Sequence, residues 1–90
     1  MQSLRMRRLA WTHDGWTDYL WWQKQDRKTL RRINTLIEET LRTPDGGIGK
    51  PEMLRGDLSG MWSRRITQEH RLVYMVTDDE VIVLSCKDRF

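Results

Sequence analysis

The stretch TPDGGIG, residues 43–49, decides the fold because the spacing of the apolar residues changes there. Proline cannot continue a helix, and the three glycines adopt backbone conformations that other residues resist. Before this loop, apolar residues recur at helical spacing, at Leu30, Ile33, Ile37 and Leu41. After it, the apolar pattern has a period of two, which is typical of strands. The loop therefore separates a helical half from a strand half.

The segment before the loop predicts a short strand and two helices. Leu9–Trp11 is expected to be the strand, and Thr12 then offers a side-chain oxygen to cap a helix that has acidic Asp14 in its first turn. Asp26 is expected to cap the second helix, which carries the apolar face. The two helices therefore meet near residue 26.

Two features of these helices suggest contacts with partners. Trp21 and Trp22 lie side by side next to the apolar stripe of the first helix, so one of them is expected to face outward. The second helix begins with four cations, whereas its acidic residues come later. This order opposes the helix dipole. A solvated face is the simpler explanation of the cations, so they are weak evidence for a binding surface.

Three strands are expected after the loop, at Met61–Ile66, His70–Val76 and Val81–Cys86. Residues 77–80 form the turn between the last two. Apolar residues occupy both faces of the middle one, so it should be central in the sheet. The order predicts an α+β fold in which two N-terminal helices pack on one face of a small, mainly antiparallel, twisted sheet.

Size and composition narrow the classes of function. Ninety residues, 1–90, make one domain, with residues 1–6 expected to be a disordered leader and Met6 an alternative start. A net charge of +3 favours an anionic partner, although an ordinary basic domain has the same charge. Cys86 is the single cysteine, which excludes an intrachain disulfide. The only histidines in the sequence are His13 and His70, so we expect neither a metal site nor a cofactor. No membrane segment or signal peptide is visible, so a cytoplasmic location is expected.

Charged side chains gather between residues 49 and 71. On a strand, Arg65 shares a face with Ser63 while Arg64 shares the other with Trp62, and hairpin pairing could bring Arg71 close to Arg65. Arginines that converge with a carboxylate suit a phosphodiester, because guanidinium groups bind phosphate and a carboxylate accepts a hydroxyl proton. A solvated ladder of cross-strand ion pairs explains the same residues, so both hypotheses stay open at this point.

A histidine also lies in this region. His70 precedes Arg71 and therefore points to the opposite face of the strand. We interpret it as a packed or hydrogen-bonded histidine and not as a general acid.

Several motifs together resemble the YoeB (Txe/YoeB) toxin family of the RelE-like superfamily. They are GKPEML at 49–54, LSGMWSRRI at 58–66 and EHRLVY at 69–74, with WTDYL at 16–20, DRK at 26–28 and RTP at 42–44 upstream. The resemblance runs without a gap from about residue 8 to the C-terminus. It implies a RelE-like fold and a ribosome-dependent endonuclease that cuts mRNA in the A site through attack of the 2′-hydroxyl on the adjacent phosphate.

The resemblance also implies roles for individual residues. Glu52 matches the family's general base, and Arg65 and Arg71 match its phosphate-binding, transition-state-stabilising arginines. Arg55 stands where the family usually has lysine, and Lys50 is expected to be a supporting RNA contact.

The C-terminus departs from the family pattern. Members typically end Arg-Tyr-His-Tyr, with the histidine as general acid, whereas this chain ends Lys87-Asp88-Arg89-Phe90. Arginine stays protonated and is a poor proton donor, while Phe90 can stack on a base but lacks the hydroxyl. Either Arg89 stabilises the leaving oxygen electrostatically, or the protein is a weak or inactive enzyme that serves as an antitoxin- or ribosome-binding module. We expect reduced turnover.

The family resemblance implies partners as well. These are a YefM-type antitoxin whose acidic, disordered C-terminal segment folds onto the toxin, the bacterial ribosome and its mRNA. The outward tryptophan is a candidate for the antitoxin surface or for a homodimer interface.

Overall fold

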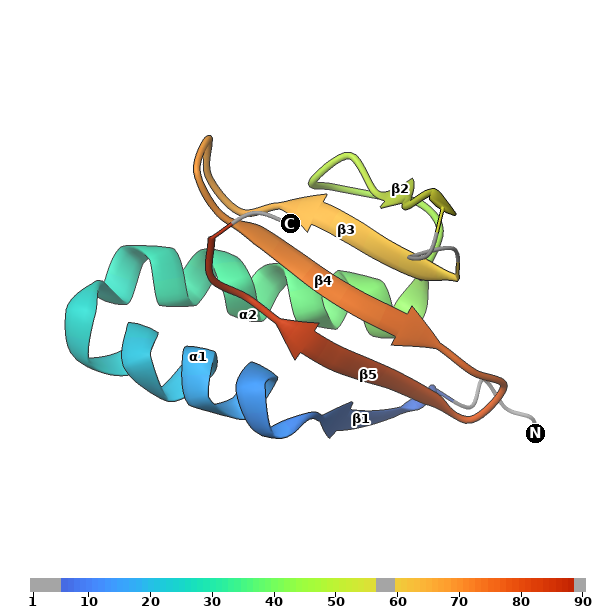
Figure 1. Cartoon of the computed structure of the whole chain (residues 1–90), viewed down its shortest axis with the longest axis horizontal. Helices are drawn as coiled ribbons and strands as arrows, with labels where there is room; N and C mark the ends of the chain where they lie inside the picture. Colours follow the sequence, from blue (N-terminus) through green and yellow to red (C-terminus); the bar gives the residue numbers. More distant parts are fainter. Residues whose placement is uncertain (1–5, 57–59, 89–90) are drawn as a thin grey trace.

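The computed structural model describes residues 6–56 and 60–88, in which two helices cover one face of a five-stranded sheet (Figure 1). The elements follow the order β1 (Arg8–Trp11), α1 (His13–Gln25), α2 (Arg27–Arg42), β2 (Glu52–Met53), β3 (Met61–Arg65), β4 (Arg71–Val76) and β5 (Glu80–Ser85). The predicted α+β fold is confirmed. Of the predicted leader, only Met6 is among the described residues, and it is exposed.

The strands lie in the order β1-β5-β4-β3-β2, so β4 is central as expected. The β2–β3, β3–β4 and β4–β5 pairs are antiparallel, whereas β1 and β5 run parallel. A parallel pair needs a crossover connection, and α1 and α2 are the first part of that connection. Strand β2 lies between the loop 43–49 and the first strand that we expected after it. Its pairing covers only Glu52 and Met53, which is too short for a strand pattern in the sequence.

Both predicted helix caps are confirmed. The side chain of Thr12 accepts a hydrogen bond from the Gly15 amide at 3.0 Å. Asp26 accepts bonds from the Thr29 hydroxyl and from the amides of Thr29 and Lys28, which lower the pKa of its carboxyl group. These bonds satisfy amides that have no partner inside the helix. The caps therefore fix the residue at which each helix begins.

The core lies between the helices and the sheet. Ile33 and Ile37 are buried as predicted, while Leu30 and Leu41 are only partly buried. The apolar stripe had missed Leu36, which is fully buried. From α1, Trp22 is 4% exposed and Trp21 is 39% exposed, so one tryptophan of the pair faces outward as expected. None of the described helices is long and apolar enough to cross a membrane.

Candidate functional site on the open face of the sheet

The site is built on the β3–β4 hairpin, on the face of the sheet that the helices leave uncovered. Arg65 and Arg71 are direct cross-strand partners, as the sequence predicted. Directly paired residues point to the same face and lie about 4.5–5.5 Å apart at Cβ. The hairpin register therefore places the two arginine side chains next to each other on one face of the sheet.

Strand β2 adds the carboxylate to this pair. Glu52 pairs with Ser63, which lies two residues before Arg65 and shares its face. One terminal nitrogen of Arg71, Nη1, lies 4.0 Å from Oε1 of Glu52. The structure thus brings Glu52, Arg65 and Arg71 together, although they come from three different strands.

The ion-pair ladder explains only part of this arrangement. The Arg71–Glu52 contact is at the outer limit of an ion pair, and the Glu52 side chain is 69% exposed, so the pair stabilises the fold little. Within residues 6–56 and 60–88, the guanidinium of Arg65 has no hydrogen bond or ion pair, and Glu69 pairs with neither arginine. Arg65 is therefore an exposed cation whose charge the described structure does not neutralise.

Arg71 also carries an unsatisfied donor. Its Nε atom is buried and has no hydrogen-bond partner in the described structure. Buried donors without partners are rare, and strain, a catalytic role, or a bound water or ion can explain them. Arg71 and Arg65 together are thus a pair of cationic donors with capacity for an anion such as a phosphate.

Lys50 and Arg55 lie before and after β2, and both side chains are exposed. Lys50 has a φ of 52°, a conformation that non-glycine residues seldom adopt, and Pro51 follows it. The chain therefore turns sharply just before Glu52. Arg89 and Phe90 lie outside the described residues.

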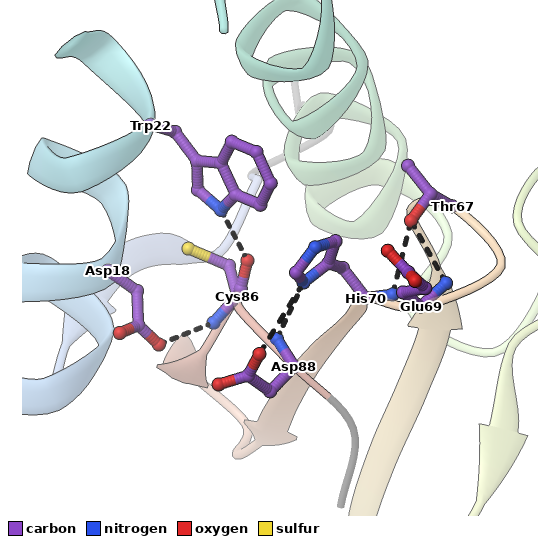
Figure 2. Close-up of polar contacts among 7 residues, drawn as sticks. All are labelled: Asp18, Trp22, Thr67, Glu69, His70, Cys86 and Asp88. Carbon is purple, nitrogen blue, oxygen red and sulfur yellow. Dashed lines mark hydrogen bonds and ion pairs between the residues drawn. The ribbon is translucent and has the colours of Figure 1, made fainter. Parts of the chain in front are cut away.

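His70 is a packed and hydrogen-bonded histidine, as expected from the sequence (Figure 2). Its Nδ1 accepts a hydrogen bond from the Asp88 amide at 2.7 Å, and its ring packs edge-on against Trp22. A nitrogen that accepts carries no proton, so the Asp88 carboxylate 3.9 Å away is not its ion-pair partner. His70 thus lies on the helix side of the sheet and holds the last described residues.

Arg64 is the residue whose role the sequence did not reveal. It neighbours Arg65 but points to the helix side, where it is 0% exposed. Its guanidinium binds backbone carbonyls of the 43–48 loop and the Tyr74 hydroxyl. Strand alternation separates Arg64 from Arg65, but it does not tell which of the two is buried.

The arrangement suits phosphate chemistry. Two arginines can hold an anionic group while a nearby carboxylate accepts a proton. Among residues 6–56 and 60–88, no cluster of three or more His, Cys, Asp or Glu side chains could hold a metal ion.

Comparison with known proteins places the chain among relatives of one kind. A family described as YoeB-like toxin of bacterial type II toxin-antitoxin systems matches residues 11–90. Toxin YoeB of Escherichia coli (strain K12) is 54% identical over 80 residues, which cover 89% of this chain and 95% of that protein. The solved YoeB/ParE toxin from Agrobacterium tumefaciens is 45% identical, with a TM-score of 0.88 over 92% of this chain and 99% of that one.

Structures from Staphylococcus aureus are similar too. A YoeB dimer superposes with a TM-score of 0.88, and YoeB in a heterotetrameric YoeB–YefM toxin–antitoxin complex with a TM-score of 0.85. Both are 38% identical and cover 96% of this chain and 100% of theirs. More distantly, a chain of the RelBE2 complex from Mycobacterium tuberculosis shares the fold at 22% identity and a TM-score of 0.70.

Proposed function

This chain belongs to the YoeB-like toxins of bacterial type II toxin–antitoxin systems, and we propose that it is an endoribonuclease that cuts mRNA in the ribosomal A site. The observation that supports this most directly is the grouping of Glu52, Arg65 and Arg71 on the open face of the sheet. A carboxylate beside two cationic donors has the composition required for cleavage of a phosphodiester without a cofactor.

In the proposed reaction, Glu52 accepts the proton of a ribose 2′-hydroxyl. The 2′-oxygen then bonds to the adjacent phosphorus, and the bond from phosphorus to the 5′-oxygen breaks. The products are a 2′,3′-cyclic phosphate and a free 5′-hydroxyl, once the leaving oxygen has taken up a proton. Arg65 and Arg71 stabilise the negative charge that grows on the other phosphate oxygens. Among the described residues, the exposed Arg65 guanidinium has no hydrogen bond or ion pair, which supports this assignment.

Lys50 and Arg55 are proposed to contact the RNA backbone from the exposed ends of β2. Phe90 is proposed to stack on a base, and Arg89 to stabilise the leaving oxygen by its charge. Since Arg89 cannot donate a proton efficiently, water has to protonate the leaving oxygen. We therefore propose an attenuated enzyme.

The proposed regulator is a YefM-type antitoxin. The similar toxin from Staphylococcus aureus forms a complex with YefM, and this chain has a net charge of +3 that suits an acidic antitoxin segment. The dimer of the same toxin makes self-association a second interaction to measure for this chain.

The decisive experiment is cleavage of mRNA on programmed bacterial ribosomes by the purified chain. Glu52→Ala should reduce the cleavage rate by about 10²–10⁴-fold, the usual worth of a general base. Arg71→Ala should reduce it by about 10²–10³-fold through loss of charge stabilisation. Arg42→Ala, which removes an exposed arginine from the end of α2, serves as the control and should leave the rate unchanged.

Three outcomes would contradict the proposal. Cleavage that persists in both variants would place the chemistry elsewhere. Intact mRNA at high protein concentration, together with retained ribosome or antitoxin binding, would favour the alternative that this chain is a non-catalytic binding module. Cleavage of naked RNA at the same rate would remove the ribosome from the mechanism.

A further inference from the structure

Arg64 is a charged residue that the proposed reaction does not use. Its side chain is fully buried, and no carboxylate of the described residues lies within ion-pair distance of it. Arginine remains charged in proteins, so burial without an anionic partner is costly unless every donor finds an oxygen. We therefore expect Arg64 to have a role other than packing in the core.

Neutral oxygens bind the guanidinium, three of them from one loop and one from Tyr74 in β4. Its Nη1 donates to the Ile48 carbonyl at 2.8 Å, and its Nη2 donates to the Thr43 and Gly46 carbonyls at 2.6 and 2.7 Å. The Tyr74 hydroxyl accepts from Nε at 3.1 Å and donates to the Pro44 carbonyl at 2.7 Å. Four carbonyls of the segment 43–48 are therefore held by Arg64 and Tyr74 together.

The same loop is packed against the stem of Arg64 where it ends. Gly49 has a φ of 85°, and a Cβ added there would lie 3.2 Å from the Arg64 Cβ and 2.8 Å from Leu36. The Gly49 carbonyl accepts a hydrogen bond from the Arg65 amide at 2.7 Å. The loop thus meets β3 at the position of Arg64 and Arg65.

The general base lies three residues beyond this point. Glu52 belongs to a strand of only two residues, and one further bond, from the Leu54 amide to the Met61 carbonyl at 2.8 Å, follows it. A strand this short has little stability of its own. The position of Glu52 relative to Arg71 therefore depends on what holds the preceding loop.

We propose that Arg64 is a positioning residue for the reaction: it holds loop 43–49 against the sheet and thereby keeps Glu52 opposite Arg71. It does not touch RNA, since four of its five N–H donors bind protein oxygens and its side chain is buried. The inference has a structural half, that Arg64 holds the loop, and a catalytic half, that this positions Glu52 for the reaction. Only the catalytic half rests on the proposed function.

The test compares Arg64→Met and Arg64→Lys in two backgrounds, the otherwise unaltered chain and the Glu52→Ala variant. Methionine keeps much of the length without donors, and lysine keeps the charge with fewer donors in another geometry. In the otherwise unaltered chain, Arg64→Met should lower kcat by about 100-fold with little change in KM, since a displacement of about 1 Å can have that effect. Arg64→Lys should restore part of the rate. In the Glu52→Ala background, the same substitutions should have almost no further effect.

The matched control is Arg42→Met, the same change at an exposed arginine just before the loop. It should leave kcat unchanged. Losses by Arg64→Met that are equal in both backgrounds would overturn the proposal, because Arg64 would then act on the whole fold. An unchanged kcat in the folded Arg64→Met chain would overturn it as well.

Hydrogen exchange tests the inference separately from cleavage. In Arg64→Lys and Arg64→Met, the Arg65 amide, which bonds the Gly49 carbonyl, should exchange at least tenfold faster, while the Val83 amide in the core strand β5 keeps its protection. Unchanged exchange at Arg65 would show that Arg64 does not hold the loop. If the unaltered chain fails to cut mRNA on ribosomes, the nuclease proposal and the catalytic half of this inference fall. The exchange rates then still decide the structural half.

Discussion

Three arginines near the site show how position determines the role of one residue type. Arg64 and Arg65 are neighbours in β3, yet one is fully buried and the other is exposed. Arg71, opposite Arg65 in β4, is partly buried, and its Nε has no hydrogen-bond partner among the described residues. The side-chain chemistry is identical in all three. Only the face of the strand and the partners on that face distinguish a structural arginine from the two proposed phosphate ligands.

A substitution at residue 89 is expected to increase the activity. Arg89→His would restore the general acid of the family pattern, and general acids are usually worth about 10²–10⁴-fold in rate. We expect cleavage on ribosomes to rise by at least tenfold. The gain should be largest at mildly acidic to neutral pH, where histidine can both hold and release a proton. Arg89→Lys, which keeps a cation that is a poor acid, is the control. An equal rate in all three chains would show that proton donation does not limit this enzyme.

Cys86 gives a prediction about alkaline stability. The thiol is fully buried, and burial, with a smaller contribution from the Asp18 charge, raises its pKa from about 9 to about 12. Below pH 9 the thiol is neutral in both the folded and the unfolded chain. Between pH 9 and 12 only the unfolded chain ionises, so the free energy of unfolding falls as the pH rises, by at most about 1.4 kcal/mol per pH unit.

The measurement is urea denaturation at pH 8.0 and pH 10.5 for the unaltered chain and for Cys86→Ala. The alanine variant should lose roughly 1–2 kcal/mol less over this interval, because it has no thiol to ionise. Burial also raises the pKa of Tyr74, but both chains contain that residue, so its effect cancels. Equal losses in the two chains would mean that the Cys86 thiolate is tolerated in the fold.

At the scale of elements, helix α2 has its charges in the unfavourable order. No acidic residue lies in its first turn, which holds Arg27 and Lys28. Arg27 and Arg31 are also like charges at i and i+4, and the described structure gives neither guanidinium a hydrogen-bond or ion-pair partner. The helix forms nevertheless because the Asp26 cap and the buried residues Ile33, Leu36 and Ile37 outweigh these small electrostatic costs.

Reversing one of these charges should therefore stabilise the protein. Arg27→Glu places an acid in the first turn and creates an attractive pair with Arg31, which should raise the free energy of unfolding by about 0.5–1 kcal/mol. Arg42→Glu makes the same charge change in the last turn, where the dipole favours a cation, and should lower it. Urea denaturation at low salt measures both. Equal effects of the two substitutions would show that net charge, and not helix position, is responsible.

At the scale of the whole molecule, Cys86, which follows the last strand, is hydrogen-bonded to helix α1. The Trp22 indole donates to the Cys86 carbonyl at 2.7 Å, and the Cys86 amide donates to the Asp18 carboxylate at 3.1 Å (Figure 2). Two residues on, the Asp88 carbonyl accepts from the Arg71 amide at 3.0 Å. Helix α1, the start of β4 and residues 86–88 thus form one hydrogen-bonded unit next to the proposed site.

Trp22→Phe tests how much this connection contributes to stability. It leaves the buried Cys86 carbonyl without the indole donor, and an unsatisfied buried group costs about 1–3 kcal/mol. We expect a loss of that size in the free energy of unfolding, measured by urea denaturation. Trp21→Phe, at a tryptophan that is 39% exposed, is the matched control and should change stability little. Equal losses would assign the effect to aromatic size and not to the hydrogen bond.

The sequence by itself determined the features that depend on neighbouring residues. Thr12 and Asp26 predict the helix starts because a capping side chain bonds amides two or three positions away. The break at Pro44 and the glycines follows from backbone sterics. Strand alternation placed Arg65 and Arg71 on one face, since a tight hairpin leaves few registers open. Glu52 entered the candidate site through the family motif.

Only the tertiary structure decided the features that join distant parts of the chain. No local pattern encodes the parallel pairing of β1 with β5 or the two-residue strand β2. The burial of Arg64 depends on the carbonyls of Thr43, Gly46 and Ile48, which lie 16 to 21 residues earlier in the chain. Period and propensity report which face a residue occupies. Period and propensity do not report which residues cover that face, because those residues come from distant parts of the chain and contact it only in the folded structure.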